Sequence, residues 1–199
     1  MESIRLIPVI LAGYLLGSLS LAVFLSQRLG ADIRTLGSGN AGATNMARVY
    51  GALPGVAVLL FDIGKAAAAM LLGAHLAGES GLAAAGIACV LGHCYPILHG
   101  FRGGKAVSVG AAASFAVDGR VGVAALAIFA VTVLLSKKVS LGSVCAALSV
   151  AVTALLVRPS APRLVLALFA ALMLLWRHRE NIARLRSGTE KDFRFGKRG

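Results

Sequence analysis

Charged residues are scarce in this sequence. Only 14% of its 199 residues are Asp, Glu, Lys or Arg, whereas 58% are hydrophobic, and the mean hydropathy is +0.83. Soluble domains carry about 25% charged residues, so the composition excludes that class and indicates an integral membrane protein. Cysteine is also rare: Cys89, Cys94 and Cys145 lie within or beside apolar runs. Their spacing is not that of metal ligands, so we expect small buried residues and no metal site.

Acidic residues are scarcest of all. Eight Asp and Glu stand against twenty Lys and Arg, which gives a net charge of +12. In a soluble protein this excess would suggest a nucleic-acid partner. In a membrane protein basic residues collect on the cytoplasmic side, so the excess indicates topology first and anionic lipid or substrate second. We therefore expect a lipid bilayer around the chain and no nucleic acid.

Seven apolar runs bounded by charged or turn residues predict seven helical segments. The segments are Leu6–Gln27, Leu53–Ala77, Gly81–Leu98, Ala106–Val117, Val121–Leu135, Val139–Val157 and Leu164–Trp176. A spanning helix needs about 20 mostly apolar residues, and the fourth and seventh segments are shorter than this. The spread of segments from end to end predicts one domain over residues 1–199, an all-α bundle of seven transmembrane helices.

The positions of basic residues supply an independent topology signal. With seven crossings, one side receives residues 26–50, 99–105 and 136–138 and the tail from Arg177. This side holds fifteen Lys and Arg, against four on the other side, so it is predicted to be cytoplasmic and the N-terminus external. A single tilted helix over 106–135 would give six crossings and place the basic tail outside. Because Asp118-Gly119-Arg120 suits a tight turn, we favour seven.

The first of three polar clusters on the predicted cytoplasmic side is a small-residue loop. Its glycines allow successive backbone N–H groups to converge on a phosphate, and its polar side chains add donors before the fixed charge of Arg48. The candidate binding residues are Gly37, Ser38, Gly39, Asn40, Gly42, Thr44 and Asn45. The glycine spacing also matches a dinucleotide loop, but no strand precedes it. A flexible membrane loop remains the simpler alternative.

The second cluster, residues 92–105, joins the third and fourth segments. Gly103, Gly104 and Lys105 fall where the fourth segment begins. A Lys and free N–H groups at a helix N-terminus favour a bound anion. The alternative is a structural turn with a snorkelling Lys.

The third cluster, residues 178–190, follows the last segment. On a helix, His178 and Asn181 share one face at i, i+3 spacing. The alternative is a basic interfacial helix bound to anionic lipid. All three clusters therefore converge on the cytoplasmic rim, where they predict a phosphate-binding pocket.

Polar residues also interrupt the apolar segments. Asp62 and Lys65 stand at i, i+3 in the second segment, where they are expected to pair on one helix face. Such a pair serves function or structure equally well. Ser140 and Ser143 begin the sixth segment, where either serves as a helix cap or as a donor to substrate.

The three motifs together resemble those of one family, the bacterial acyl-phosphate:glycerol-3-phosphate acyltransferases (PlsY family). The family motifs match at residues 37–45 with Arg48, at 92–96 and 103–105, and at 178–190. Two positions depart from the pattern, since Tyr95 replaces the usual Phe and Ala106 replaces the usual Gly. The resemblance covers nearly the whole chain.

This resemblance implies transfer of a fatty acyl group from acyl phosphate to the 1-hydroxyl of glycerol 3-phosphate, which yields lysophosphatidic acid and phosphate. It implies an enzyme of a bacterial inner membrane, with its site facing the cytoplasm. We expect the enzyme to be monomeric and to use no cofactor. The implied catalytic residues are Ser38, Arg48, Lys105, His178 and Asn181. Either His178 or the phosphate of the donor serves as base. A transporter for a phosphorylated metabolite and a structural lipid-binding bundle are the rival functions.

Overall fold

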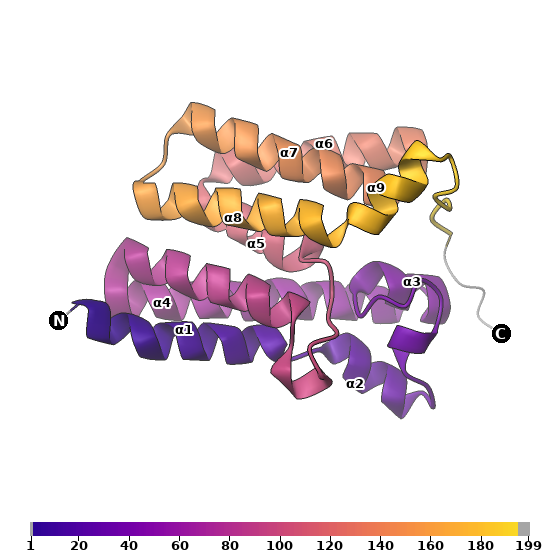
Figure 1. Cartoon of the computed structure of the whole chain (residues 1–199), viewed down its shortest axis with the longest axis horizontal. Helices are drawn as coiled ribbons and strands as arrows, with labels where there is room; N and C mark the ends of the chain where they lie inside the picture. Colours follow the sequence, from indigo (N-terminus) through magenta and orange to yellow (C-terminus); the bar gives the residue numbers. More distant parts are fainter. Residues whose placement is uncertain (1, 195–199) are drawn as a thin grey trace.

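The computed structural model describes residues 2–194, which form a bundle of helices (Figure 1). The α-helices are α1 (Glu2–Ser18), α2 (Leu21–Arg28), α3 (Ala43–Tyr50), α4 (Ala52–Cys94), α5 (Val107–Val117), α6 (Gly119–Ser136), α7 (Val139–Val157), α8 (Ala161–Arg177) and α9 (Arg179–Arg186). Two 3-10 helices are η1 (Ile33–Thr35) and η2 (Ile97–His99). No β-strand occurs within the described range, which confirms the predicted all-α class.

Among the described residues, four stretches are long and apolar enough to cross a membrane: residues 5–28, 52–99, 119–136 and 139–157. A fifth qualifies if α8 and α9, which are bent by 57° at His178, form one span. Helix α5 has 11 residues and is shorter than a full crossing. The chain thus carries the apolar helices of an integral membrane protein.

The continuity of the predicted segments differs from expectation at one place. The segment predicted over Leu6–Gln27 is two helices, because the chain breaks after Ser18 and the Ser20 hydroxyl caps α2 by accepting the Val23 N–H at 3.3 Å. The second and third predicted segments are the two arms of α4, which folds back at Ala77–Gly78 as a hairpin (Figure 1). The predicted break between these two segments is thus confirmed, whereas the break after Ser18 depends on local capping, which hydropathy alone does not register.

The predicted turn at Asp118 is confirmed. Helix α5 ends at Val117 and α6 begins at Gly119, and the Asp118 carboxylate accepts the Arg120 N–H at 2.8 Å. Residues 106–135 are therefore two helices.

Small residues let neighbouring helices approach until their backbones nearly touch. A Cβ on Gly17 of α1 would overlap the carbonyl of Cys89 in the second arm of α4, and a Cβ on Gly81 would overlap the carbonyl of Gly73 in the first arm. Hydrocarbon gives little hydrophobic drive for helix association, so close packing of this kind is what holds membrane helices together.

The helices form two layers with α5 between them (Figure 1). One layer holds α1 and the hairpin of α4, and the other holds α6, α7 and α8. At one end of the bundle, Arg163 donates to the Val117 carbonyl at 3.3 Å and pairs with Glu79 at 3.2 Å. At the other end lie α3, α9 and the loops that carry the three polar clusters.

Candidate active site

The three polar clusters are joined to one another by direct contacts. Arg34, just before the first cluster, donates from Nη1 to the carbonyl of His99 in the second at 2.7 Å. Asp32 fixes the same guanidinium through an ion pair of 2.7 Å, and this partner lowers the pKa of the Asp32 carboxyl. Lys105 in the second cluster places its Nζ 2.5 Å from Oδ1 of Asn181 in the third. The clusters therefore form one polar site.

Asn45 organises the first loop, residues 36–42, from within. Its buried Oδ1 accepts the Ser38 N–H at 2.8 Å, and its Nδ2 donates to three backbone carbonyls. These carbonyls belong to Ile33, Leu36 and Asn40, at 3.2, 2.9 and 3.0 Å. Gly37 and Gly39 have φ of +59° and +70°, values that favour glycine. The amide of Asn45 is thus committed to the loop, while Ser38 is exposed.

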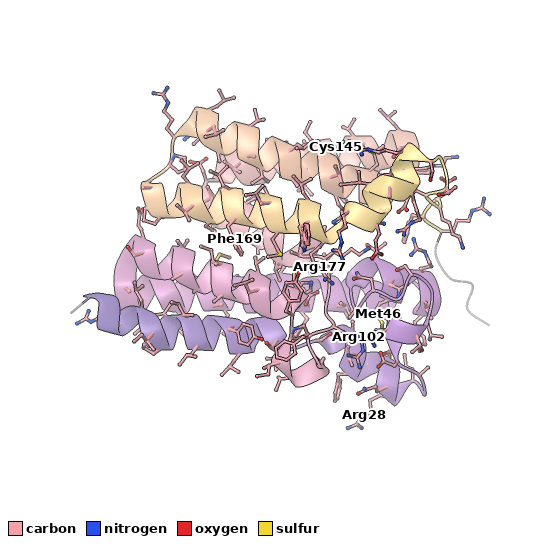
Figure 2. The ribbon with its side chains drawn as sticks, viewed as in Figure 1. Arg28, Met46, Arg102, Cys145, Phe169 and Arg177 are labelled. Atoms are coloured by element: carbon pink, nitrogen blue, oxygen red, sulfur yellow. The ribbon has the colours of Figure 1, made fainter. Side chains whose placement is uncertain are left out.

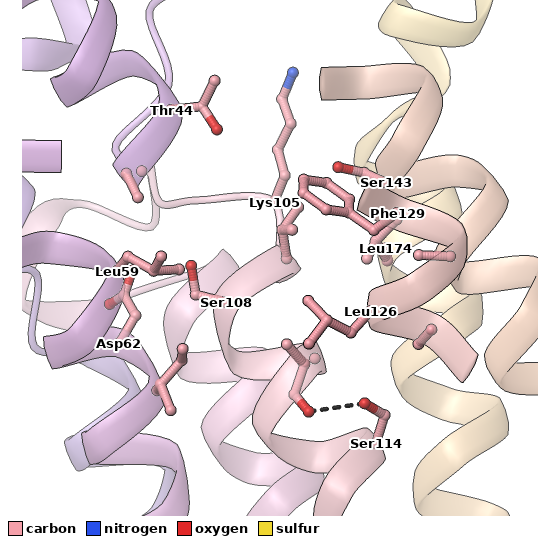
Figure 3. Close-up of a pocket in the computed structure, with 18 of the residues that line it drawn as sticks. Thr44, Leu59, Asp62, Lys105, Ser108, Ser114, Leu126, Phe129, Ser143 and Leu174 are labelled. Carbon is pink, nitrogen blue, oxygen red and sulfur yellow. Dashed lines mark hydrogen bonds between the residues drawn. The ribbon is translucent and has the colours of Figure 1, made fainter. Parts of the chain in front are cut away.

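Helix α3 begins where the first loop ends. Gly42 is its N-cap residue and supplies no side-chain cap, so the positive end of the helix dipole faces the site. Thr44 in the first turn points into a cavity (Figure 3). Arg48 follows one turn later and is half-buried. This arrangement suits an anion.

The second loop, residues 95–106, delivers Lys105 to the centre of the site. Ala106, which is fully buried, has φ of +62° and starts α5 from a left-handed conformation. This left-handed conformation favours glycine, which explains why the family motif usually has Gly where this chain has Ala106. Burial, followed by the charge of Arg184, lowers the pKa of Lys105.

His178 lies at the bend between α8 and α9 and is only 4% exposed. Its Nδ1 lies 2.9 Å from the Leu174 carbonyl, so Nδ1 carries the proton and Nε2 is an acceptor. Burial lowers the pKa of His178 to about 4, which keeps the imidazole neutral near pH 7. Asn181 donates from Nδ2 to Glu190 at 2.7 Å, and this contact directs its Oδ1 toward Lys105.

A cavity of about 380 Å³ opens beside Lys105 and continues into the apolar interior. Thr44 from α3 and Ser143 from α7 stand on either side of Lys105 at the polar mouth (Figure 3). Deeper residues that line it are Leu59, Ile63, Leu126, Phe129, Val150 and Ala171. Leu59 and Leu126 are also exposed on the outer surface of the bundle, so the cavity borders the lipid-facing side.

The predicted site residues divide by position. Those that line the cavity are Asn40, Gly42, Thr44, Lys105 and Ser143. Asn181 contacts Lys105, and Gly103 and Gly104 precede it in the second loop. Ser38, Arg48 and His178 lie at the same end of the bundle but outside the cavity lining. Within residues 2–194, no three His, Cys, Asp or Glu side chains are grouped to hold a metal ion.

Two residues of this region had no signal in the sequence. Phe193 lines the mouth of the cavity, and its N–H donates to the Lys137 carbonyl at 2.8 Å, beside an ion pair of 2.7 Å between Asp192 and Lys138. Arg177 reaches from α8 to the second loop (Figure 2). Both contacts join residues far apart in the chain, which no local pattern predicts.

Comparison with known proteins gives one consistent result. The family model described as glycerol-3-phosphate acyltransferase matches residues 7–188. A glycerol-3-phosphate acyltransferase of Shouchella clausii is 42% identical, and the match covers 94% of this chain and 95% of the relative. A glycerol-3-phosphate acyltransferase of Geotalea daltonii is 38% identical, and the match covers 94% of this chain and 97% of the relative. The crystal structure of PlsY, an integral membrane glycerol 3-phosphate acyltransferase in its glycerol 3-phosphate form, superposes with a TM-score of 0.90 at 34% identity, covering 95% of this chain and 96% of its own.

The left-handed conformation of Ala106 gives a prediction for stability. A residue with a Cβ destabilises the fold by about 1–2 kcal/mol in this conformation, and glycine would relieve that strain. Glycine also has more conformational freedom in the unfolded chain, which offsets about 0.4–1 kcal/mol of the relief. Ala106 is also fully buried, and loss of its methyl group costs about 0.8 kcal/mol. Ala106→Gly should therefore change the free energy of unfolding by less than about 0.5 kcal/mol, measured as thermal melting in detergent. Ala112→Gly, inside α5, is the matched control and should lower it by about 1 kcal/mol. Equal losses in the two variants would contradict the assignment.

The buried imidazole of His178 gives a prediction for pH. With its pKa lowered to about 4, His178 should remain the neutral Nδ1–H tautomer at pH 6 in ¹⁵N NMR spectra assigned with His178→Gln. Because the folded pKa is below the ordinary 6.5, the stabilising contribution is complete above pH 6.5 and is lost as the pH falls toward 4. An imidazolium signal at pH 6 would contradict this environment.

Proposed function

Since the chain belongs to the glycerol-3-phosphate acyltransferase family, we propose that it transfers a fatty acyl group from acyl phosphate to the 1-hydroxyl of glycerol 3-phosphate. The products are lysophosphatidic acid and inorganic phosphate. One observation carries this proposal: a polar rim with Lys105 at its centre opens directly into an apolar cavity that borders the lipid-facing surface. Such a site accommodates a molecule with a phosphate at one end and a hydrocarbon tail at the other.

The proposed setting is the inner membrane of a bacterium, with seven crossings. In this topology the end of the bundle that carries the site faces the cytoplasm, and the N-terminus is external. Fifteen of the Lys and Arg residues in the sequence belong to the cytoplasmic side. The short helix α5, surrounded by α4, α6, α7 and α8, crosses where other helices cover it. We also propose a monomer of one domain.

The three clusters have different proposed roles in binding the two substrates. Ser38 and the amides of the first loop orient one phosphate, aided by Gly37, Gly39, Asn40, Gly42 and Thr44, with Asn45 as the scaffold that fixes their backbone. Arg48 and Lys105 neutralise phosphate charge, with Gly103, Gly104 and Ser143 around the Lys105 ammonium. His178 and Asn181 hold the glycerol phosphate, which the contact of 2.5 Å between Asn181 and Lys105 brings next to the donor.

The reaction mainly requires that the protein position both substrates and stabilise charge, because an acyl phosphate is already an activated mixed anhydride. The glycerol hydroxyl attacks the acyl carbonyl, the carbon–oxygen bond to phosphate breaks, and the hydroxyl proton leaves with attack. Neutral His178 offers Nε2 as an acceptor for that hydroxyl. Its pKa of about 4 makes it a weak base, so we propose that the leaving phosphate takes the proton.

The direct test supplies the purified protein with palmitoyl phosphate and labelled glycerol 3-phosphate. We expect labelled lysophosphatidic acid and an equal amount of phosphate, and no product from palmitoyl-CoA. Folded protein that forms no product from either donor would overturn the proposed function. Product from palmitoyl-CoA alone would overturn the donor while leaving the acceptor in place.

The apolar cavity predicts a site at which chain length is controlled. Gly110 on α5 lines the cavity, and a Cβ there would meet only Leu174, at 3.9 Å, so a larger side chain enters open space. Gly110→Leu should reduce kcat/KM for palmitoyl phosphate by about tenfold or more, with a smaller effect on octanoyl phosphate and an unchanged KM for glycerol 3-phosphate.

Gly64 provides the matched control for this variant. It lies on α4 outside the cavity lining, and a Cβ there would meet nothing within 4 Å. Gly64→Leu should leave both donors unaffected. If Gly110→Leu and Gly64→Leu had the same activity on palmitoyl phosphate, the acyl chain would not occupy this cavity.

A further inference from the structure

Arg177 is the last residue of α8, and its side chain binds the second loop. Its Nε donates to the Gly104 carbonyl at 3.1 Å, and its Nη2 donates to the Gly103 carbonyl at 3.2 Å. The guanidinium also stacks over the ring of Tyr95, at 5.1 Å from the ring centroid. One planar group thus fixes two consecutive peptide groups and the residue where the loop begins.

The same loop also contacts His93. The Gly104 N–H donates to the His93 carbonyl at 3.0 Å. A Cβ on Gly104 would overlap the His93 ring, and a Cβ on Gly103 would overlap the His93 carbonyl. The two glycines are therefore held both by the backbone and ring of His93 and by the guanidinium of Arg177.

The His93 ring is in turn held by a buried ion pair. Lys65 Nζ lies 2.8 Å from the Asp62 carboxylate, 2.6 Å from the Leu19 carbonyl and 3.3 Å from His93 Nδ1. An ammonium only donates, so Nδ1 accepts and the proton of the ring is on Nε2, the atom nearest Gly104. The pair predicted from the sequence thus fixes the orientation of the ring beneath the loop.

From these contacts we propose that Arg177 is a positioning residue for acyl transfer, and that His93 is the second support of the same clamp. The clamp sets the direction of the peptide that leads into Lys105, whose Nζ then reaches Asn181. This inference rests on the proposed function and deepens it: the clamp positions Lys105, and through it Asn181, for the substrate phosphates without touching substrate.

The neighbouring Arg179 is a matched control. It is exposed, donates from Nη1 to the Trp176 carbonyl at 3.2 Å, and stacks on the Trp176 ring at 4.9 Å. It therefore has the same charge and the same kind of contacts as Arg177, two residues away, but no bond to the second loop is found among its described contacts.

The experiment compares Arg177→Ala, Arg177→Lys and Arg179→Ala with the wild-type enzyme in steady-state assays of both substrates. We expect Arg177→Ala to lower kcat/KM at least tenfold whichever substrate is varied, because Lys105 faces the phosphates of both. Arg177→Lys should recover less than half of the loss, because an ammonium lacks the planar fork that reaches both carbonyls. Added methylguanidinium should restore activity to Arg177→Ala, and Arg179→Ala should behave as wild type.

A local readout separates positioning from general damage. In Arg177→Ala, amide hydrogen exchange should accelerate within residues 95–106 and not in α7. A kcat/KM within twofold of wild type, no rescue by methylguanidinium, or exchange that accelerates throughout the bundle would overturn the clamp. An inactive wild-type protein would instead overturn the proposed function, so the two failures are distinguishable.

Discussion

Breaks in the helices free backbone carbonyls inside a membrane protein, and this constraint shapes the molecule. Hydrocarbon offers no hydrogen bond to a free carbonyl, so each must be satisfied by the protein. Lys65 reaches the carbonyl of Leu19 at the break between α1 and α2, and the Tyr14 hydroxyl donates to the carbonyl of Tyr95 at 2.8 Å, where α4 ends. Arg177 does the same for the second loop. The irregular backbone that a phosphate site needs is thus stabilised by side chains from other helices.

The same constraint explains why the polar chemistry gathers at one end of the bundle. Along the shared length of the helices, small residues such as Gly17 and Gly81 bring backbones together and leave little room for polar groups. At the end that carries α3 and α9, the chain is irregular and its loops are cross-linked by Arg34 and by the contact between Lys105 and Asn181. In the proposed function, the hydrogen-bond donors of the loops at this end bind the charged groups of the substrates, while the apolar cavity below binds the hydrocarbon chain.

Much of this arrangement follows from the sequence alone. Hydropathy located the apolar helices, and the parity of basic residues brought the three clusters to one end, because both signals are local or additive. The internal role of Asn45, the left-handed Ala106 and the clamp on Gly104 were not predictable in the same way. Each depends on which backbone atoms lie nearby in space, and the hydrogen bonds of Asn45 to Ile33 span 12 residues while those of Arg177 to Gly104 span 73.

A site built for positioning has little need for strong acids or bases. The buried imidazole of His178 stays neutral, and its Nδ1–H is already used by the Leu174 carbonyl, so only Nε2 is left to face a partner. Lys105 is half-buried and bound to Asn181, which limits its motion as well as its hydration. Groups held in this way lose little freedom when a charged transition state forms, because their dipoles are oriented beforehand. For a donor that is already activated, that preorganisation matters more than a nucleophile of the protein's own.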